Sequence, residues 1–352
     1  MKILVINSGS SSIKYKVFWM PKAKRLRKGS IEKIGEKGSK IKDHYAGLKL
    51  ILKRIDGVDA VGHRVVHGAQ KFKKPTLINA AVIGKIRECG SIAPLHNPAN
   101  LSGITACKRL LPGVKQAAVF DTAFYRSLPD YAYIYGLPYE YYIRFGIRKY
   151  GFHGTSHEYV AAKAAQRLRR PLNKLKMITA HLGNGCSITA VNKGKAVDTS
   201  LGFTPLEGLV MGTRCGDIDP ALVTYIMRKV RLKPSQIDLI LNKESGLRGI
   251  SGISNDMRTL LRKARAGNKR AKLAIEIFVY RIKKYIGAYT AIMGGCDALV
   301  FTAGIGENQK RIRDKVCAGL FSYLKKAPRV LVIPTDEELM IAQKTYQLMK
   351  AG

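Results

Sequence analysis

The stretch MKILVINSGSSSIKYKVF, residues 1–18, carries the pattern that decides the fold. Four apolar residues run into a segment of asparagine, glycine and serines that starts at Asn7, and a second apolar stretch containing Lys14 follows. The polar segment is too long for the usual two-residue hairpin turn. Its hydroxyl and backbone N–H groups suit an anion. The stretch therefore predicts two strands joined by an anion-binding loop.

A second stretch, MITAHLGNGCSITAV at 177–191, repeats this arrangement. Each has an apolar strand, a polar residue (Asn7 or His181), a glycine two positions later (Gly9 or Gly183), small residues and another strand. Such a match is typical of a duplicated unit. We expect one copy in each of two domains, with both hairpin loops facing a shared cleft.

Strands and helices alternate along the chain. Strand-like runs followed by glycine-rich turns occur at 3–12, 177–185 and 298–308. Helix-like segments separate them, the clearest lying at 157–170, 221–230 and 269–292. This alternation predicts an α/β architecture with packed, mostly central sheets. A domain boundary is expected within the tyrosine- and proline-rich stretch near 122–150.

Composition indicates an ordinary globular protein. The chain has 352 residues, 46% of them hydrophobic, enough for two domains with real cores. Its six cysteines form no CxxC pair, so neither a zinc site nor a disulfide framework is expected. No signal-peptide core and no apolar run of membrane-spanning length is evident. We expect a cytoplasmic protein with no membrane partner.

The charge is strongly basic, with 62 Lys and Arg against 24 Asp and Glu, a formal net of +38. One hypothesis is nucleic-acid binding. The other is a solvated basic surface that also attracts anionic metabolites. The basic residues are spread along the chain with only short clusters, at 22–28 and 262–270, and no zinc-finger or RNP-type motif accompanies them. The second hypothesis is favoured.

The glycine-rich segments and two arginines suit phosphate. GIGEN at 304–308 lacks the Lys-Ser/Thr ending of a P-loop, and no GxGxxG opens a helix, so neither nucleotide motif is present. Glycine-rich turns can still bind phosphates through backbone amides. Arg64 and Arg214 lie among turn residues, where a guanidinium offers two parallel donors to a carboxylate or phosphate. The alternative is a structural ion pair, for example with Asp217 or Asp219.

Histidines and carboxylates supply further candidates. His153 is surrounded by glycines and could donate to a transferring phosphoryl group, or simply be a satisfied turn residue. Zinc is disfavoured, because the i, i+4 histidine pairs lack HExxH and an obvious third ligand. Asp121 follows an apolar run, at a strand end where α/β active sites collect. Glu337 and Glu338 begin a segment that is also typical of an acidic first helical turn, and one such carboxylate could hold Mg²⁺.

Taken together, these segments closely resemble the acetokinase family, within the superfamily of acetate and sugar kinases, heat-shock ATPases and actin. The segments that carry the resemblance occur in one order from residue 1 to 339: MKILVINSGSSSIKY, GHRVVHG, APLHNPAN, FDTAF, KYGFHGTSHEYV, HLGNGCSITAV, DTSLGFTPLEGLVMGTRCGDIDP, SGLRGISGISNDMR, FTAGIGEN and VIPTDEEL.

The resemblance implies two duplicated RNase H-like domains, each with a mixed central sheet flanked by helices, and a cleft between them. The N-terminal acyl-substrate and phosphate domain would comprise 1–125 plus 338–352, and the nucleotide-binding domain 126–337. It implies reversible, direct in-line phosphoryl transfer from ATP to acetate, giving ADP and acetyl phosphate, with Mg²⁺ or alternatively Mn²⁺. A homodimer without a specific nucleic-acid partner is also implied. Segments 20–60 and 309–331 look trimmed relative to the family.

The resemblance also assigns roles to individual residues. The catalytic residues would be Asp121, His153 and Arg214. The acyl substrate would contact Arg64 and an apolar pocket of Val66, Leu95, Phe152 and Pro205. The metal-linked residues would be Asn7 and Glu337. The nucleotide would contact Lys14, His181, Leu182, Gly183, Asn184, Gly185, Asp256, Met257, Arg258, Gly304, Ile305, Gly306, Glu307 and Asn308. Since a carboxylate acceptor is already ionised at neutral pH, Asp121 need not be a general base; orienting an arginine or a metal-bound water suits it better.

Two other functions remain open from the sequence. Propionate kinases share nearly all these motifs, and one methylene changes binding in an apolar pocket by only about 1–3 kcal/mol. The bulky Val66 favours acetate. The other alternative is a catalytically inactive, basic nucleic-acid-binding or scaffold protein, against which the full set of arginine, histidine and carboxylate candidates argues.

Overall fold

The computed structural model describes residues 1–94 and 96–351. Contacts divide the chain into two compact units. Unit 1 comprises Met1–Arg126, Gly154–Tyr159 and Asp336–Gly352, and unit 2 comprises Ser127–His153 and Val160–Thr335. Compared with the domain limits expected from the sequence, unit 1 gains Arg126, 154–159 and 336–337. Side-chain contacts tie the two later segments to unit 1: Thr155 donates to Asp121, and Asp336 pairs with Lys16.

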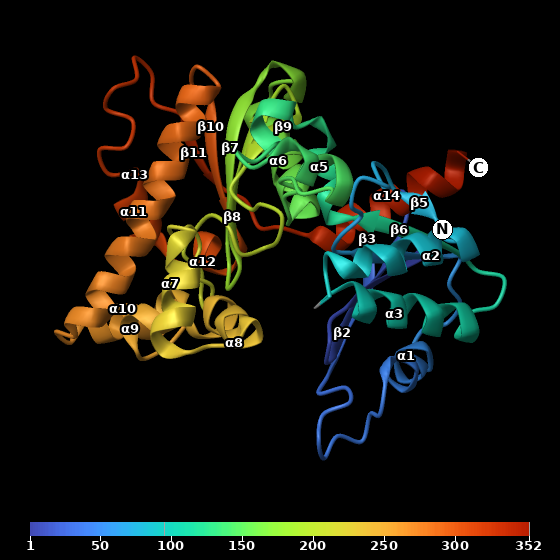
Figure 1. Ribbon diagram of the computed structural model, residues 1–352. Coiled ribbons are helices and arrows are strands. Elements are labelled where there is room, and N and C mark those ends of the chain that lie inside the picture. The colour runs from blue at the N-terminus through green and yellow to red at the C-terminus, as the bar shows by residue number, and fades with distance from the viewer. Residues whose placement is uncertain (95, 352) are drawn as a thin grey trace. The chain divides into compact units, whose positions relative to one another are not determined.

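Unit 1 contains a mixed sheet. Within the described residues it has six strands in the order β3-β2-β1-β4-β6-β5. Figure 1 labels β2, β3, β5 and β6 of this sheet. The strands are β1 (Lys2–Ser8), β2 (Ser12–Trp19), β3 (Lys24–Glu32), β4 (Ala60–Val65), β5 (Thr76–Leu77) and β6 (Lys115–Phe120). β1, β4 and β6 are parallel, whereas β2 and β3 continue the sheet in antiparallel fashion. The carboxyl ends of the parallel strands therefore meet at one edge.

Unit 2 repeats this topology. Its sheet, described over five strands, has the order β11-β10-β7-β8-β9. The strands are β7 (Lys176–Leu182), β8 (Cys186–Asn192), β9 (Lys195–Thr199), β10 (Ala298–Thr302) and β11 (Arg329–Val332). β7, β10 and β11 are parallel, and β8 and β9 are antiparallel additions. Because β1–β2 and β7–β8 occupy equivalent places, the predicted duplication is confirmed.

Helices cover both sheets. Those of unit 1 are α1 (His44–Leu52), α2 (Ala80–Glu88), α3 (Asn97–Leu110) and α14 (Glu337–Ala351). α6 (Gly154–Leu168) starts in unit 1 and continues into unit 2. The helices of unit 2 are α4 (Asp130–Tyr133), α5 (Tyr139–Phe145), α7 (Ala221–Val230), α8 (Pro234–Leu239), α9 (Gly246–Ser251), α10 (Met257–Arg265), α11 (Lys269–Ile292), α12 (Ala303–Asn308) and α13 (Lys310–Cys317). Shorter helical turns are η1 (Cys89–Ser91), η2 (Asp121–Ser127), η3 (Leu172–Lys174) and η4 (Ile240–Glu244).

Strand β1 shows how the unit 1 sheet builds two cores. Successive side chains of a strand point to opposite faces. Leu4 and Ile6 accordingly pack in a cluster with residues of α1 and α3, whereas Ile3 and Val5 pack with α14. A Cβ on Gly62 of β4 would lie only 2.5 Å from Thr345 Oγ1 of α14, so the glycine admits this helix. The C-terminal helix thus returns to the first unit, as the resemblance implied.

Two helices match their predicted ranges, and one predicted turn is wrong. α7 and α11 cover 221–230 and 269–292 as expected. GIGEN is not an open turn but most of α12, which follows β10 directly. The Glu307 carboxylate explains this: its Oε1 accepts from Ala303 N at 2.8 Å and Thr335 N at 3.2 Å, closing the backbone into a helical turn.

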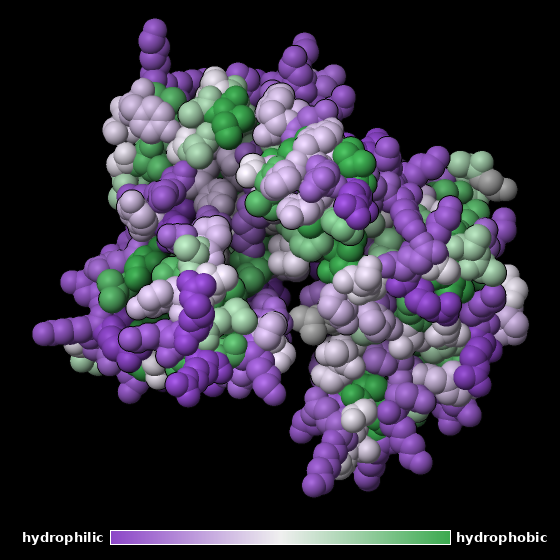
Figure 2. Space-filling view, viewed as in Figure 1, coloured by the Kyte–Doolittle hydropathy of each residue, from purple (hydrophilic) through white to green (hydrophobic). Residues whose placement is uncertain are grey.

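Three further features bear on the sequence-based expectations. Figure 2 shows hydrophilic residues spread over the visible face of each unit rather than gathered in one stripe. Across 1–94 and 96–351, every helix is too short or too polar to cross a membrane. All six cysteines in this range carry free thiols.

Candidate functional site

In unit 2, His153 is fixed beside the β7–β8 loop. Its backbone is left-handed, with φ of 57°, immediately before α6. Its Nδ1 lies 2.8 Å from Ser187 Oγ on β8. The ring stacks on that of His181 with centroids 4.3 Å apart and planes 20° apart. These contacts from β7 and β8 set the orientation of the imidazole, and Ser187 was not singled out by the sequence.

Arg214 approaches the same loop. A Cβ on Gly185 would lie 3.3 Å from Arg214 Nη1 and 3.5 Å from His153 Nε2. The glycine thus leaves room for both nitrogen-bearing side chains at one point of the backbone. The sequence-based grouping of His153, Arg214 and the HLGNG segment is therefore observed within unit 2.

The Arg214 guanidinium is partly buried and available to an anion. It donates to Pro205 O at 3.2 Å and contacts Met211 Sδ at 3.7 Å. Among the described residues no carboxylate lies within 4 Å of it, so the structural ion pair considered from the sequence is absent there. Asp217 instead accepts from Gly208 N and Tyr285 OH. Burial lowers the pKa of Arg214 from its usual value, as expected for a desolvated cation that lacks a counter-ion.

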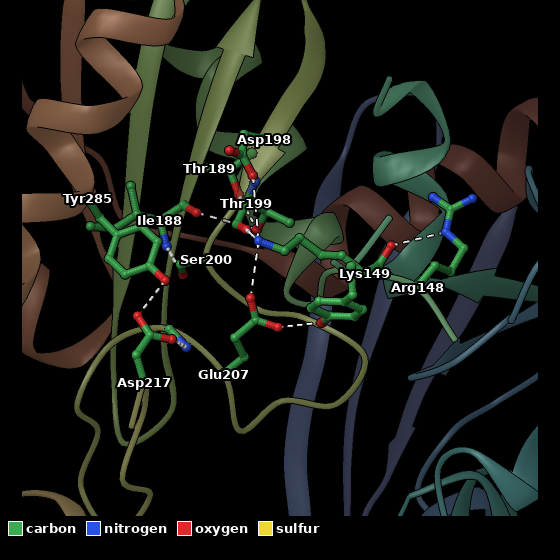
Figure 3. A network of polar contacts seen from close by, with 12 residues as sticks. Arg148, Lys149, Ile188, Thr189, Asp198, Thr199, Ser200, Glu207, Asp217 and Tyr285 are labelled. Carbon is green, nitrogen blue, oxygen red and sulfur yellow. Dashed lines mark hydrogen bonds and ion pairs between the residues drawn. The ribbon is translucent and has the colours of Figure 1, made fainter. Parts of the chain in front are cut away.

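A polar network holds the segment that carries Pro205 and Arg214 (Figure 3). Lys149 Nζ donates to Thr199 O at 3.1 Å and pairs with Glu207 Oε1 at 3.2 Å. The other Glu207 oxygen accepts from Tyr135 OH. Tyr285 OH donates to Asp217 Oδ2 at 2.7 Å. Glu207 and Asp217 thereby tie the irregular segment between β9 and α7 to the rest of unit 2.

A pocket of about 490 Å³ adjoins the β7–β8 loop. It is lined by Gly183, Asn184, Asn255, Asp256, Met257, Arg258, Gly304, Ile305, Asn308 and Gln309. Asn255 Nδ2 donates to Asn184 Oδ1 at 2.9 Å, joining two of its walls. Three segments expected to contact the nucleotide thus line one cavity, and Asn255 and Gln309 were missed. Asn255 lies within the quoted SGISNDMR motif, next to Asp256.

Some of the expected nucleotide residues face elsewhere. Asp256 caps α10 by accepting from Arg258 N at 3.1 Å, while still lining the pocket. Gly306 is buried, and the Glu307 carboxylate is engaged by backbone N–H groups. Leu182 is fully buried. Of these residues, Asp256 lines the pocket, whereas Leu182, Gly306 and Glu307 are not among its described lining residues.

In unit 1, Arg64 is locked to a buried carboxylate. Its Nε and Nη2 donate to Asp121 Oδ2 at 3.0 and 2.7 Å, and Asp121 is only 1% exposed. Thr155 Oγ1 donates to the other oxygen at 2.8 Å. Glu337 Oε2 lies 3.8 Å from Arg64 Nη1. Although burial opposes the charge, Asp121 and Glu337 raise the pKa of Arg64. Asp121 therefore orients this arginine, one of the two roles preferred from the sequence.

The first turn of α14 carries an ion cluster that the sequence did not reveal. Lys16 Nζ lies 2.8 Å from Asp336 Oδ1 and 2.9 Å from Glu338 Oε2. Asp336 Oδ1 also accepts from Leu339 N at 3.0 Å, which caps the helix. Lys16 and Lys14 share one face of β2 because side chains alternate along a strand. That spacing was the available signal for Lys16.

The carboxyl end of β4 is fixed by asparagines of α3. Asn100 Oδ1 accepts from Val66 N at 3.0 Å, and Asn100 Nδ2 donates to Ser8 O at 2.8 Å. Asn97 similarly engages His67 N and O. Of the residues expected to line the acyl pocket, Val66 lies in unit 1, Phe152 and Pro205 lie in unit 2, and Leu95 lies outside the described residues.

The β1–β2 loop is shorter than its sequence suggested. β1 ends at Ser8 and β2 begins at Ser12, so only 9–11 connect the two strands. Gly9 N donates to Ser12 O at 2.8 Å, and Gly9 O accepts from the His44 ring at 2.7 Å. Asn7 and Lys14 are paired across the hairpin, with Lys14 exposed. The Ser8 hydroxyl is buried without a hydrogen-bond partner among the described residues.

The Glu337 carboxylate is of a kind that suits Mg²⁺, which prefers oxygen ligands. Burial, together with the like charges of Asp121 and Glu338, raises the pKa of Glu337 against the opposing effect of Arg64. A cation there would relieve that repulsion. Over the described residues, no three His, Cys, Asp or Glu side chains are grouped to hold a metal ion by themselves. Mg²⁺ does not need such a cage, since it usually takes one or two carboxylates plus waters and substrate phosphates.

Two histidines of the GHRVVHG segment are buried and neutral. His63 Nε2 lies 2.8 Å from Gln116 Oε1, and burial lowers the pKa of both His63 and His67 to about 4. The unfolded chain takes up these protons near pH 6.5, so folding free energy is lost as pH falls from 6.5 toward 4. By pH 4, each histidine lowers the free energy of unfolding by about 3 kcal/mol relative to neutral pH.

We expect His63→Asn to flatten the pH dependence of stability. Urea unfolding at pH 4.5, 5.5, 6.5 and 7.5 should give a slope smaller by up to one proton than that of the parent. The variant loses some stability at pH 7.5, because Asn fills less of the core. An unchanged slope would show that His63 is not held neutral.

Comparisons with known proteins identify the family of the chain. The family model described as "Acetokinase family" matches residues 2–325. The acetate kinase of Halothermothrix orenii is 50% identical over 398 aligned positions, covering all of both chains, so it carries segments absent from these 352 residues. The crystal structures of Porphyromonas gingivalis acetate kinase and of a propionate kinase from Francisella tularensis are each 44% identical, with a TM-score of 0.92. They cover 99% and 98% of this chain, and 99% of each of those chains. The chain belongs to the acetokinase family.

Proposed function

We propose that the protein transfers the terminal phosphoryl group of ATP to acetate, forming acetyl phosphate and ADP in a reversible reaction. The observation that carries this proposal is Arg214: a partly buried guanidinium without a carboxylate partner among the described residues, set with His153 against Gly185, whose loop borders the 490 Å³ pocket. The nucleotide would occupy that pocket.

Phosphoryl transfer needs positioning and positive charge more than covalent chemistry. Arg214 and His153 would donate to the equatorial oxygens of the transferring group. Arg64, held by Asp121, would bind the acetate carboxylate with its planar donors. The acceptor is already ionised at neutral pH and attacks directly, so no proton has to be removed from it.

Mg²⁺, held by Glu337 and Asn7, would neutralise charge on the nucleotide phosphates when bound. Lys14, exposed on β2 beside Asn7, would approach the same phosphates. Glu338 and Asp336 would keep the first turn of α14 in place through Lys16. A homodimer, as is usual for the family, completes the proposal.

A hydroxamate assay for acetyl phosphate tests the function. Protein, ATP, Mg²⁺ and acetate should give product in proportion to enzyme, with little product when acetate or metal is omitted. A gel-shift titration with DNA at several salt concentrations runs beside it. No hydroxamate signal together with tight, salt-sensitive DNA binding would favour the inactive nucleic-acid-binding alternative.

Propionate is the second candidate acceptor, because the Francisella tularensis propionate kinase is 44% identical to this chain. Val66 is the position that we expect to discriminate. Its amide is fixed by Asn100, so a smaller side chain enlarges the pocket without moving the backbone. A methylene is worth about 1–3 kcal/mol in such a pocket.

We expect Val66→Ala to shift kcat/KM toward propionate relative to acetate by about tenfold. Rates with acetate, propionate and butyrate measure the shift, and Val82→Ala of α2 is the control for losing the same two methyl groups elsewhere in unit 1. A parent enzyme more efficient on propionate than on acetate would reverse the proposed order of acceptors.

A further inference from the structure

A second pocket in unit 2 is lined mainly by cationic side chains. It has a volume of about 630 Å³ and lies where α6 and α11 end and where β7, β10 and β11 begin. The lining residues are Arg167, Leu168, Arg170, Lys176, Gly294, Gly295, Cys296, Asp297, Lys326, Ala327 and Arg329. The lining thus holds five cations, from three segments of the chain, and one carboxylate, Asp297, from a fourth.

Three of the cations are held in place by backbone oxygens. Arg167 Nη1 donates to Val332 O at 3.3 Å, Lys176 Nζ to Gly294 O at 3.2 Å, and Arg170 Nη2 to Lys174 O at 3.2 Å. These hydrogen bonds restrict the conformations of the three side chains before a ligand binds. The pocket is therefore partly preorganised for an anion.

The positive charge is not neutralised by the protein around it. Asp297 is already engaged by Arg170 Nη1 and by Lys176 N, both at 2.8 Å. The C-terminal ends of α6 and α11 add about half a negative charge each. An excess of about three positive charges remains, and an exposed cluster of like charges is destabilising in itself. A bound polyanion would remove that repulsion.

This pocket and the nucleotide pocket lie at opposite ends of strand β7. Lys176 is the first residue of β7, whereas Gly183 follows its last residue. Seven residues of strand span roughly 20 Å. The two pockets therefore lie at opposite ends of the parallel strands, and the cations at one end cannot contact a nucleotide at the other.

We infer that this pocket is a second anion site, specific for compounds that carry two or more linked phosphate groups. Among the described residues, the lining has no aromatic side chain on which a base could stack. Recognition would therefore rest on the phosphates, whose oxygens suit the arginine donors. A single phosphate would match only part of the charge.

Inorganic tripolyphosphate is the probe, with calorimetric titration and peptide-resolved hydrogen exchange as readouts. The parent protein should bind it at two places, with protection at 294–297 and 326–329 as well as around the nucleotide pocket. Lys326→Ala/Arg329→Ala should lose the first protection and weaken that binding event at least tenfold. Lys326→Gln/Arg329→Gln, which preserves side-chain bulk, should behave alike. Inorganic phosphate should give no protection at 294–297.

The matched control is Arg228→Ala/Lys229→Ala, which removes the same charges from the last turn of α7 in the same unit. It should retain both binding events. Kinase activity without tripolyphosphate should be unchanged in every variant, so the outcome is independent of the proposed function. Equal binding by the parent and the Lys326/Arg329 variants, or protection confined to the nucleotide pocket, would overturn the inference.

Discussion

Arg214→Ala is expected to lower kcat for acetyl phosphate formation by about 100- to 1,000-fold, the usual cost of losing one preorganised donor to a transition-state oxyanion. The fold should survive, because Arg214 has no carboxylate partner among the described residues to be left unpaired. The lost hydrogen bond to Pro205 O costs about 1–3 kcal/mol at most. The Arg214→Ala variant is therefore expected to lose turnover while remaining folded.

Two variants sharpen this prediction. Arg214→Lys keeps the charge but loses the planar pair of donors, and we expect an intermediate kcat. Arg265→Ala removes an exposed arginine of α10 in the same unit and should match the parent. Steady-state kinetics with circular dichroism as a check on folding measure all three. Parent-like turnover in Arg214→Ala would remove this residue from the mechanism.

Arg64→Ala is expected to damage both activity and stability. The substrate loses its carboxylate-binding guanidinium, which should lower kcat/KM for acetate by at least 100-fold. In addition, Asp121 remains buried without its cation, and breaking such a pair costs about 3–5 kcal/mol. Replacing Arg64 is thus expected to lower stability as well as activity, whereas replacing Arg214 should lower activity alone. The sequence placed both arginines among turn residues and did not distinguish them.

The double variant Arg64→Ala/Asp121→Asn separates the two effects. The amide carries no charge and still accepts from Thr155, so much of the lost stability should return. Activity should not return, because no guanidinium is restored. Urea denaturation and acetate kinetics on the parent, both single variants and the double variant give the comparison. Recovery of activity in the double variant would show that Arg64 serves only to neutralise Asp121.

The local sequence pattern was sufficient to predict the duplication and much of the secondary structure. The strand-loop-strand stretches at 1–18 and 177–191 repeat the same order of apolar, polar and glycine residues, and the two sheets have matching topology. The long amphipathic segment at 269–292 became α11 without change. Such features depend on residues close in sequence, which is why they can be predicted.

Contacts between distant residues could not be predicted in this way. GIGEN is tied to the segment before α14 because the Glu307 carboxylate accepts from Thr335 N, which lies 28 residues later. Lys16 is a partner of Asp336 and Glu338, more than 300 residues away. The Thr155–Asp121 bond likewise depends on the close approach of α6, where a Cβ on Gly154 would clash with Asp121 O. No local periodicity encodes these pairings.

The most direct test of the central claim is a phosphorus NMR spectrum of the protein mixed with ATP, Mg²⁺ and acetate. If the protein moves a phosphoryl group from the nucleotide to the carboxylate, acetyl phosphate and ADP appear together in equal amounts. ADP accompanied only by inorganic phosphate, or no change in the ATP signals, would contradict the account.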